Sequence, residues 1–381
     1  MTAETHAFEN APRHGARKRL ASAALMPLAE AVARLTGSLA PLEARDVPLA
    51  GACGLIAGAD IVSPRDDPAT ARALSDGWAA RAEDVFGASP YAPIPLSQPL
   101  AWVEAGAILP EGCDCVLPPE AIEGRSVVAD APVWSGTRAA GEEIAAGRRL
   151  IAAGARLTPL RLMALAAAGI ASVPVRRPRL LLVVTGSTEP DTLSPVVAGL
   201  AGQAGAVVTR IVRAAAAPDA IAAAIRASDA DATLILGGTG FGRHDHSAAG
   251  LASAGTVHAH GIALKPGETA AFGAADGRPV LLLPGRPDAA LSAFLALGHP
   301  LIDGLSGATA PVSRVEPLSR KVTSTIGLSE IVFTRREAGG VTPLGGADLP
   351  LQSLMEADGA ILLAPDSEGY PAGTRVEVLP L

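Results

Sequence analysis

The chain has 381 residues, of which 49% are hydrophobic and only 3% aromatic, and its formal net charge is −7. This length predicts roughly two to four domains with cores of Leu, Val, Ile and Ala. The negative charge and the scarcity of aromatic side chains argue against nucleic-acid binding. We find neither a secretory leader nor an apolar run of membrane-spanning length, and therefore expect a soluble, cytoplasmic protein that contacts no membrane.

The beginning of the chain is basic and weakly patterned. Residues 1–20 include a cluster of Arg and Lys without a following hydrophobic segment, which predicts a disordered arm. Apolar residues at helical spacing predict helices over 27–35 and 158–168, and we expect these two helices to pack side by side. Cys53, Cys113 and Cys115 are too few and too irregularly spaced for a disulfide framework.

Between those helices the chain is rich in turns and short extended segments. Residues 71–80 have the composition of a helical run, which the turn Asp76-Gly77-Trp78 interrupts. A carboxylate displayed on such a turn is a candidate ligand, although a simple helix stop is an equal alternative. The strand and turn signals over 96–133 predict a small β domain inserted into the first one.

After residue 177 continuous apolar strands alternate with helices, which predicts a parallel sheet covered on both faces. The predicted strands are 180–184, 207–212, 233–236, 262–264 and 280–283, and the predicted helices are 197–205, 218–228 and 288–297. Such sheets bind ligands at the carboxyl ends of their strands. After residue 307, strands at 332–335, 360–364 and 375–379 predict a small all-β terminal domain.

The segment from Gly237 to Asp245 follows one of these strands and contains four glycines. Glycine permits positive φ and close approach of a ligand, so successive N–H groups can surround a phosphate, while Asp245 can hold a divalent cation or a hydroxyl. Thr185-Gly186 ends a second strand, and the helix that opens after Arg286 offers further N–H groups to an anion. An ordinary glycine-rich turn is the alternative interpretation.

Four of the seven histidines lie close to this glycine-rich segment: His244, His246, His258 and His260. They support a separate hypothesis, a transition-metal site, since imidazole is a common metal ligand. Exposed side chains that point away from one another are the simpler explanation.

The order and spacing of several motifs resemble those of the molybdopterin molybdenumtransferases, the molybdenum insertases to which the gephyrin E domain belongs. The motifs are DPATARALSDGWA, AGAILPEGCDCVLPPE, RAAGEEIAAG, GGTGFGRHD, IALKPGETAAFG and LLPGRPDAAL, and the likeness covers roughly residues 26–381. The resemblance implies a multidomain α/β protein with four domains. These are a helical-extended domain (21–50 and 140–176), an inserted β domain (51–139), an α/β molybdopterin-binding domain (177–306) and a C-terminal β barrel (307–381).

The resemblance also implies a reaction, in which molybdate joins adenylylated molybdopterin with Mg²⁺-dependent release of AMP. It implies a homodimer and a molybdoenzyme as acceptor of the product. Asp76, Asp245 and Lys265 match catalytic positions of the family, and Asp245 also matches the Mg²⁺ ligand. The positions that match substrate-binding residues are Thr185, Gly186, Gly237, Gly238, Thr239, Gly240, Pro266, Gly267, Pro284, Gly285, Arg286 and Ser353.

This sequence departs from the family at several charged positions. Glu104 stands at a threonine position, Gly261 and Glu268 stand where the family has basic residues, and the TGDEL motif reads TGSTE, with Glu189 as its acid. Fewer positive charges near a polyanion weaken its binding. The departures therefore support an alternative, a paralogue that carries molybdopterin or the finished cofactor to a molybdoenzyme without catalysing insertion.

Overall fold

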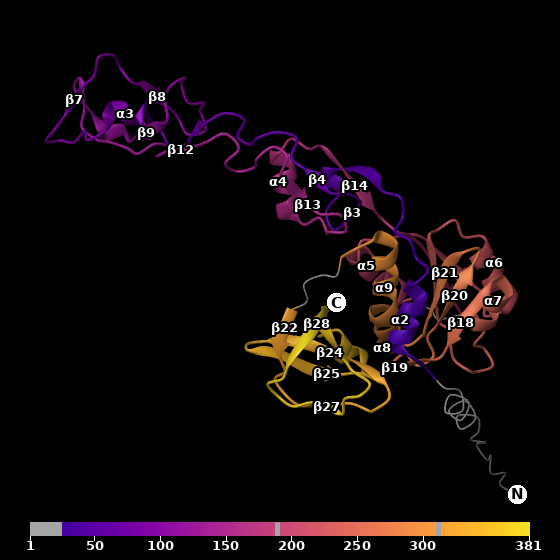
Figure 1. The fold of residues 1–381 in the computed structure, drawn as a ribbon. Helices are drawn as coiled ribbons and strands as arrows, with labels where there is room; N and C mark the ends of the chain where they lie inside the picture. Colours follow the sequence, from indigo (N-terminus) through magenta and orange to yellow (C-terminus); the bar gives the residue numbers. More distant parts are fainter. Residues whose placement is uncertain (1–24, 187–190, 310–313) are drawn as a thin grey trace, which may run out of the picture. The chain divides into compact units, whose positions relative to one another are not determined.

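The computed structural model describes residues 25–186, 191–309 and 314–381 (Figure 1). The chain divides into two compact units. Unit 1 comprises Met1–Ala44, Gly54–Ile56 and Arg176–Leu381, and unit 2 comprises Arg45–Cys53 and Ala57–Val175. The arm predicted over 1–20 and the acid Glu189 lie outside the described residues.

A six-stranded sheet in the order β16-β15-β17-β21-β20-β18 forms the centre of unit 1. β15 (Arg179–Thr185), β16 (Val207–Ala214), β17 (Ala232–Leu236) and β21 (Arg278–Leu283) are parallel, which confirms the predicted parallel sheet. β18 (Thr256–His260) and β20 (Ala271–Ala275) extend it in antiparallel fashion.

The predicted strand 262–264 belongs to a different sheet, and its assignment to the parallel sheet was wrong. β19 (Ile262–Lys265) pairs with β1 (Met26–Pro27) and with β24 (Ser329–Glu337). The change of sheet occurs at Gly261, whose φ of 105° turns the chain immediately after β18. Such a φ favours glycine.

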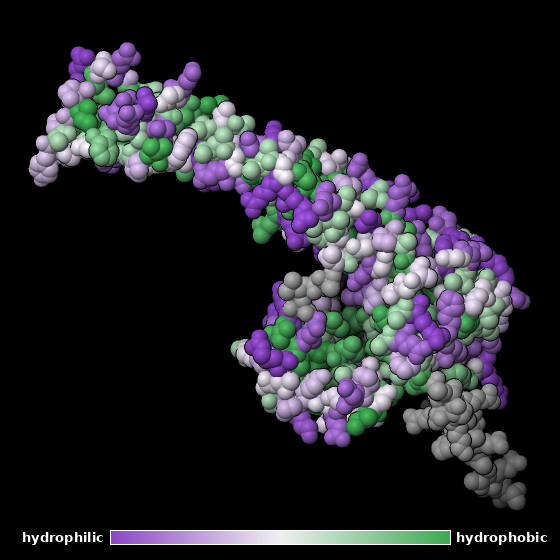
Figure 2. Space-filling model, in the orientation of Figure 1, coloured by the Kyte–Doolittle hydropathy of each residue, from purple (hydrophilic) through white to green (hydrophobic). Residues whose placement is uncertain are grey.

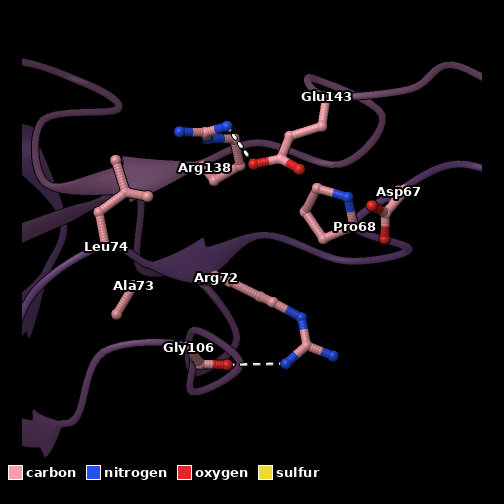
Figure 3. A pocket seen from close by; sticks show the side chains of 8 residues that line it. All are labelled: Asp67, Pro68, Arg72, Ala73, Leu74, Gly106, Arg138 and Glu143. Carbon is pink, nitrogen blue, oxygen red and sulfur yellow. Dashed lines mark hydrogen bonds and ion pairs between the residues drawn. The ribbon is translucent and has the colours of Figure 1, made fainter. Parts of the chain in front are cut away.

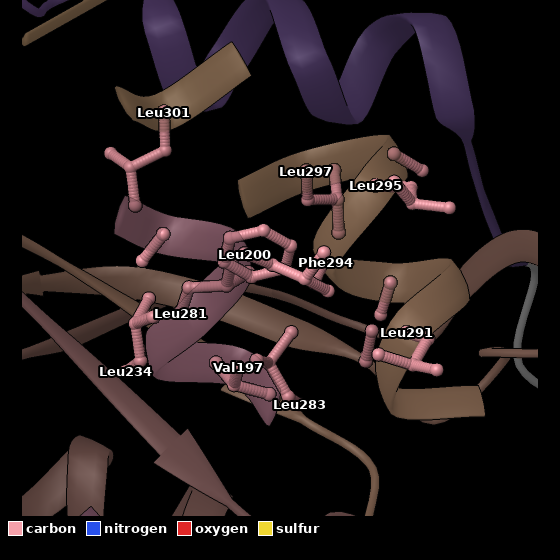
Figure 4. Packing of buried hydrophobic residues seen from close by; sticks show 14 of the residues in the cluster. Val197, Leu200, Leu234, Leu281, Leu283, Leu291, Phe294, Leu295, Leu297 and Leu301 are labelled. Carbon is pink, nitrogen blue, oxygen red and sulfur yellow. The ribbon is translucent and has the colours of Figure 1, made fainter. Parts of the chain in front are cut away.

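The inner parallel strands β15, β17 and β21 are apolar along most of their length because both faces of the sheet are buried there, whereas the edge strand β16 contains Arg210 and Arg213 and is largely exposed. In β15, Leu180 and Leu182 pack into one core, whereas Leu181 and Val183 pack into a second core on the opposite face. The first core is shown in Figure 4, where Phe294 lies among leucines from the sheet and helices. Helices that supply apolar side chains to the two cores include α5 (Ser194–Gln203), α6 (Pro218–Arg226), α7 (Ser247–Ala254), α8 (Pro287–Ala293) and α9 (His299–Ser306).

Helices α8 and α9 continue through a π-helical turn at Phe294–Gly298 into one helix over Pro287–Ser306. Contrary to expectation, this helix is long and apolar enough to cross a bilayer. Most of its residues are buried in the first core of unit 1, as is typical of the central helix of a globular protein.

Helix α2 (Leu28–Thr36) forms as predicted, and so does α4 (Pro159–Ala167), which we expected beside it. Leu28, Ala31 and Leu35 line the buried face of α2 and enter the first core of unit 1, whereas α4 belongs to unit 2. The apolar stripe of α2 is buried against α9, the π-helical turn and β19, all of which belong to unit 1.

The C-terminal strands close into a barrel. β24 pairs with β25 (Gly340–Gly345) on one side and β26 (Gly359–Leu363) on the other, and β28 (Arg375–Pro380) joins β26 to β22 (Arg314–Pro317). A bridge between Leu318 and Val341 brings the end of β22 back to β25. β23 (Val322–Thr323) and β27 (Gly369–Tyr370) form a separate pair, and α10 (Leu351–Leu354) lies between β25 and β26.

Unit 2 consists of short strands around two small apolar clusters. Its elements are β2 (Arg45–Pro48), η1 (Leu49–Gly51), β4 (Ile61–Val62), β5 (Arg72–Ala73), β6 (Gly77–Ala80), α3 (Ala82–Val85), β7 (Ile94–Pro95), β8 (Ala101–Val103), β9 (Cys115–Leu117), η2 (Pro119–Ala121), β10 (Ile122–Glu123), β11 (Ser126–Val127), β12 (Thr137–Arg138), β13 (Arg149–Ile151) and α4, while β3 (Ile56–Ala57) and β14 (Ser172–Arg176) straddle its boundaries with unit 1.

The helical composition of 71–80 was misleading. Residues 72–73 and 77–80 form strands β5 and β6 instead. β6 lies between β8 and β9, and the alanines that suggested a helix are buried against these neighbours.

Candidate active site

The glycine-rich loop begins at the carboxyl end of β17. Gly237 and Gly238 have φ values of 88° and 62°, which are accessible to glycine at little cost. The amide of Gly237 donates to the Leu283 carbonyl at 2.9 Å, and the buried Ser247 hydroxyl donates to the Gly237 carbonyl at 2.7 Å. The sheet on one side and α7 on the other thus hold the start of the loop.

Asp245 lies at the other end of the loop and folds back over it. One carboxylate oxygen, Oδ2, accepts a hydrogen bond of 2.8 Å from the Gly242 amide. A Cβ at Gly240 would lie only 2.6 Å from that oxygen, so the glycine there makes room for the carboxylate. Among the described residues none donates to Oδ1, which leaves one oxygen available to a ligand.

Two cavities open at the carboxyl ends of the parallel strands. The larger, of about 580 Å³, brings together the predicted Thr185, Gly186, Gly238 and Asp245. It adds His244, which the sequence suggested only as a metal ligand, and Ala215 and Ala216, which the sequence did not indicate. The smaller, of about 170 Å³, is lined by Thr185, Gly237 and Gly285 together with Asp191, Leu193 and other residues. The predicted anion-binding loops therefore meet at one edge of the sheet.

Asp191 is a residue of this edge that sequence reasoning missed. Its carboxylate accepts from the amide and hydroxyl of Ser194 at the start of α5, and Arg213 lies 3.9 Å away. The hydrogen bond from the Ser194 side chain, followed by backbone hydrogen bonds and Arg213, lowers the pKa of Asp191 below its ordinary value. The N-cap position of α5 is occupied by Leu193, so the sequence carried no ordinary capping signal at Asp191.

The segment Lys265-Pro266-Gly267 lies beside the glycine-rich loop. Thr269, just after it, shares a hydrogen bond of 3.0 Å with Thr239, and the ring of His260 contacts the Thr239 carbonyl at 2.9 Å. The Lys265 ammonium lies 3.4 Å from Glu330, a buried residue of β24.

Two charged side chains near this edge are already engaged within the protein. Glu268 accepts from the Gly267 amide at 3.1 Å. Arg286 donates twice to the buried Asp288 and also pairs with Asp348. Burial alone would lower the pKa of Arg286, but the two carboxylates outweigh it and raise the pKa above its ordinary value.

Pro284 and Ser353 were also predicted to bind substrate. Pro284 follows β21 and is buried beside Gly285, and Ser353 lies in α10, five residues after Asp348. Neither residue is among those that line the two cavities.

Asp76 lies in unit 2, where it is exposed just before β6. Its carboxylate accepts from the Ala105 amide at 2.8 Å and so holds the turn that carries Glu104. Arg72 donates to the Gly106 carbonyl of the same turn at 2.7 Å.

A cavity of about 340 Å³ lies beside that turn (Figure 3). Arg72 and Arg138 bring two guanidinium groups to it, and Glu143 pairs with Arg138. Asp67 also lines it. We did not single out these four residues from the sequence, although all four belong to quoted motifs, Asp67 and Arg72 to DPATARALSDGWA and Arg138 and Glu143 to RAAGEEIAAG.

The transition-metal hypothesis finds no support. Nowhere in the described ranges do three or more His, Cys, Asp or Glu side chains come together as a metal-binding group. His260 stacks on Phe241 with ring centroids 4.9 Å apart, and His258 meets the edge of Phe272 at 6.1 Å. These contacts give two of the four rings structural roles.

Comparison with known proteins agrees with this architecture. Residues 26–169 match the family model of the MoeA N-terminal region, domains I and II, and residues 179–304 match that of a probable molybdopterin-binding domain. The molybdopterin molybdenumtransferase 2 of Mycobacterium tuberculosis is 29% identical over 383 residues, covering 87% of this chain and 94% of that protein. The Haemophilus influenzae molybdopterin molybdenumtransferase is 28% identical, covering 70% and 74%.

A solved structure extends the likeness to the three-dimensional fold. The molybdopterin biosynthesis MoeA protein of Pyrococcus horikoshii superposes with a TM-score of 0.73 at 28% identity, covering 93% of this chain and 99% of that one. Both family models, the relatives and the fold therefore agree, and the chain belongs to the MoeA-type family of molybdopterin molybdenumtransferases.

Proposed function

We propose that this protein acts in molybdenum cofactor biosynthesis by inserting molybdate into adenylylated molybdopterin with release of AMP. The 580 Å³ cavity at the carboxyl ends of β15 and β17 carries the proposal. Its volume is in the range of small-molecule sites, and it combines glycine backbone with one carboxylate that has a free oxygen. This combination suits a phosphorylated ligand that binds together with a divalent cation.

The residues of this edge fit distinct roles. Gly186 leaves the backbone open to the pyrophosphate of the substrate, since a Cβ there would meet no heavy atom within 4 Å, and Gly238 lines the same cavity. Lys265 supplies positive charge, which Glu330 orients through its ion pair. Asp245 would hold Mg²⁺ through Oδ1, and the cation would offset the negative charge that AMP takes as it leaves.

We further propose that the protein is a homodimer and delivers its product to a molybdoenzyme. Helix α4 is a candidate surface for contact with a second copy of the chain, because its apolar residues Leu160 and Met163 are 73% and 65% exposed. Replacing both by Asp should yield monomers in sedimentation analysis if α4 lies in the interface, and a dimer that persists in that variant would place the interface elsewhere.

The insertase proposal is tested by the release of AMP from adenylylated molybdopterin in the presence of molybdate and Mg²⁺. Asp245→Asn should lower the rate at least about 100-fold, because a neutral amide holds the cation poorly. The matched control is Asp219→Asn, an exposed acid on α6 of the same unit, which should leave the rate unchanged.

Two results would contradict this assignment. A wild-type rate in Asp245→Asn would remove the carboxylate from the reaction. Binding of the substrate by wild-type protein without molybdate-dependent AMP release would identify a carrier instead of an insertase. Equilibrium binding of the substrate, measured in parallel, separates these outcomes from a simple loss of affinity.

A further inference from the structure

Aromatic side chains are concentrated in one small part of this chain. Tryptophan occurs only at Trp78, Trp102 and Trp134, all within residues 77–136 of unit 2. Phe86 and Tyr91 lie in the same part. Because only 3% of the whole chain is aromatic, this part has an unusual composition for the protein.

Most of these aromatic side chains face solvent. Tyr91 is 100% exposed and Phe86 83% exposed, while Trp134 and Trp102 are 51% and 46% exposed. Trp134 also has a φ of 68°, a conformation that bulky residues rarely adopt and that costs free energy. Exposed aromatic side chains held in this way are typical of interaction surfaces.

One of the five aromatic residues packs against a buried cluster, and a second contacts its ring. Trp78 packs against this cluster, which contains Val85 and Leu117, and Trp102 meets the Trp78 ring at 5.0 Å. Phe86 follows Val85 directly, and Tyr91 lies on the turn that leads to β7. Trp78 and Trp102 therefore lie on the sheet β8-β6-β9, whereas Phe86 and Tyr91 lie on the segment that joins it to the sheet β10-β11-β7.

The segment 77–136 is also strongly acidic. Residues 77–136 contain eight acids, Glu83, Asp84, Glu104, Glu111, Asp114, Glu120, Glu123 and Asp130, but only two bases, Arg81 and Arg125. Most of the chain's net charge of −7 therefore resides in them. Figure 2 shows hydrophilic residues interleaved with apolar ones over the part that contains β7 to β9.

This charge decides what can cover the aromatic side chains. A second copy of the same surface, a nucleic acid and an anionic lipid surface are all repelled by it. A cationic protein segment is attracted, and guanidinium groups bind both to aromatic faces and to carboxylates. We propose that residues 77–136 form a docking surface for an arginine-rich segment of a partner protein, an interaction beyond the proposed insertase activity.

The tryptophans make this proposal directly measurable, because their emission reports only on residues 78–134. We expect titration of the full chain with a nona-arginine peptide to change the emission in a saturable manner. The apparent affinity should fall as salt is raised. A nona-glutamate peptide should have no effect.

Variants separate the aromatic contribution from general charge attraction. The double variant Phe86→Ser/Tyr91→Ser removes two exposed rings whose loss does not open the core, and it should bind nona-arginine about ten-fold more weakly. Glu83→Gln/Asp84→Asn should weaken binding and reduce its salt dependence. The matched control, Ile326→Ser/Leu362→Ser, removes two exposed apolar side chains in unit 1 and should bind as wild type.

The proposal is overturned if the Phe86/Tyr91 variant retains wild-type affinity, since charge alone would then account for binding. It is also overturned if nona-glutamate binds as tightly as nona-arginine. AMP release measured on the same double variant should remain at the wild-type level. A failure of docking is thus distinguishable from a failure of the insertase assignment.

Discussion

Gly77 occupies a position where two neighbouring strands leave no space for a side chain. A Cβ there would lie 2.1 Å from the Leu117 carbonyl oxygen and 2.8 Å from Val116 Cγ1. We predict that Gly77→Ala lowers the free energy of unfolding by about 2–3 kcal/mol in urea denaturation, since β6 must move away from β9. Gly51→Ala is the control in the same unit, because its Cβ would make an ordinary 3.5 Å contact with Val47. Equal stability of the two variants would contradict the prediction.

Cys115 is completely buried in the cluster beside β6. Burial, with a smaller contribution from Asp114, raises the pKa of its thiol from 9.0 to about 11. Above pH 9 the Cys115 thiol ionises in the unfolded chain but stays protonated in the folded protein until about pH 11. The contribution of this group to the free energy of unfolding is therefore fully present below pH 9 and is lost as pH rises through 11.

We therefore predict that unit 2 loses roughly 2–3 kcal/mol of stability from this group as the pH rises from 9 to above 11. Cys115→Ala should flatten that part of the stability profile, measured by urea denaturation at each pH. At pH 8 a thiol reagent should modify the exposed Cys53 and leave Cys115 intact until the chain unfolds. Rapid modification of Cys115 in the folded protein would refute its burial.

The charge departures from the family also have local explanations. Gly261, which stands at a basic position of the family, has a φ of 105° at the turn between β18 and β19. The Glu268 carboxylate accepts a hydrogen bond from the neighbouring Gly267 amide. Gly261 thus coincides with a backbone conformation that favours glycine. The charge of Glu268 is partly compensated by the hydrogen bond from the Gly267 amide.

Among the elements, the helix Pro287–Ser306 supplies many apolar side chains to the largest core of unit 1. Phe294 at its π-helical turn is completely buried, and its ring meets His299 at 5.2 Å. We predict that Phe294→Ala lowers the free energy of unfolding by about 3–5 kcal/mol. Phe86→Ala is the control, because it removes the same type of side chain from a site that is 83% exposed. It should change the free energy of unfolding by less than about 0.5 kcal/mol. Thermal or urea denaturation of both variants provides the comparison.

At the scale of the whole molecule, the division into two units predicts two unfolding transitions. All three tryptophans lie in unit 2, whereas most of the helices belong to unit 1. Tryptophan emission should therefore follow unit 2, and far-ultraviolet circular dichroism should follow mainly unit 1. We expect the urea midpoints from the two probes to differ, and Gly77→Ala should shift only the emission midpoint. Coincident midpoints would show that the units unfold cooperatively.

The sequence by itself determined the alternation of strands and helices in the α/β part, the glycine-rich loop at a strand end, and the family. These features depend on local periodicity, on glycine's backbone freedom and on the order of motifs, all of which can be read from neighbouring residues. Thr185, Gly186, Gly238 and Asp245 could be expected together for this reason, since parallel strands end at one edge.

Only the tertiary structure decided which partners those residues meet. The strand Ile262–Lys265 joined the C-terminal sheet, α2 packed into unit 1, and the run 71–80, whose composition is helical, formed strands at 72–73 and 77–80. Arg286 met Asp288 and Asp348, and Lys265 met Glu330. The pairs Lys265–Glu330 and Arg286–Asp348 join residues more than sixty positions apart. Their energies come from burial and charge in the folded chain, and no local sequence pattern contains that information.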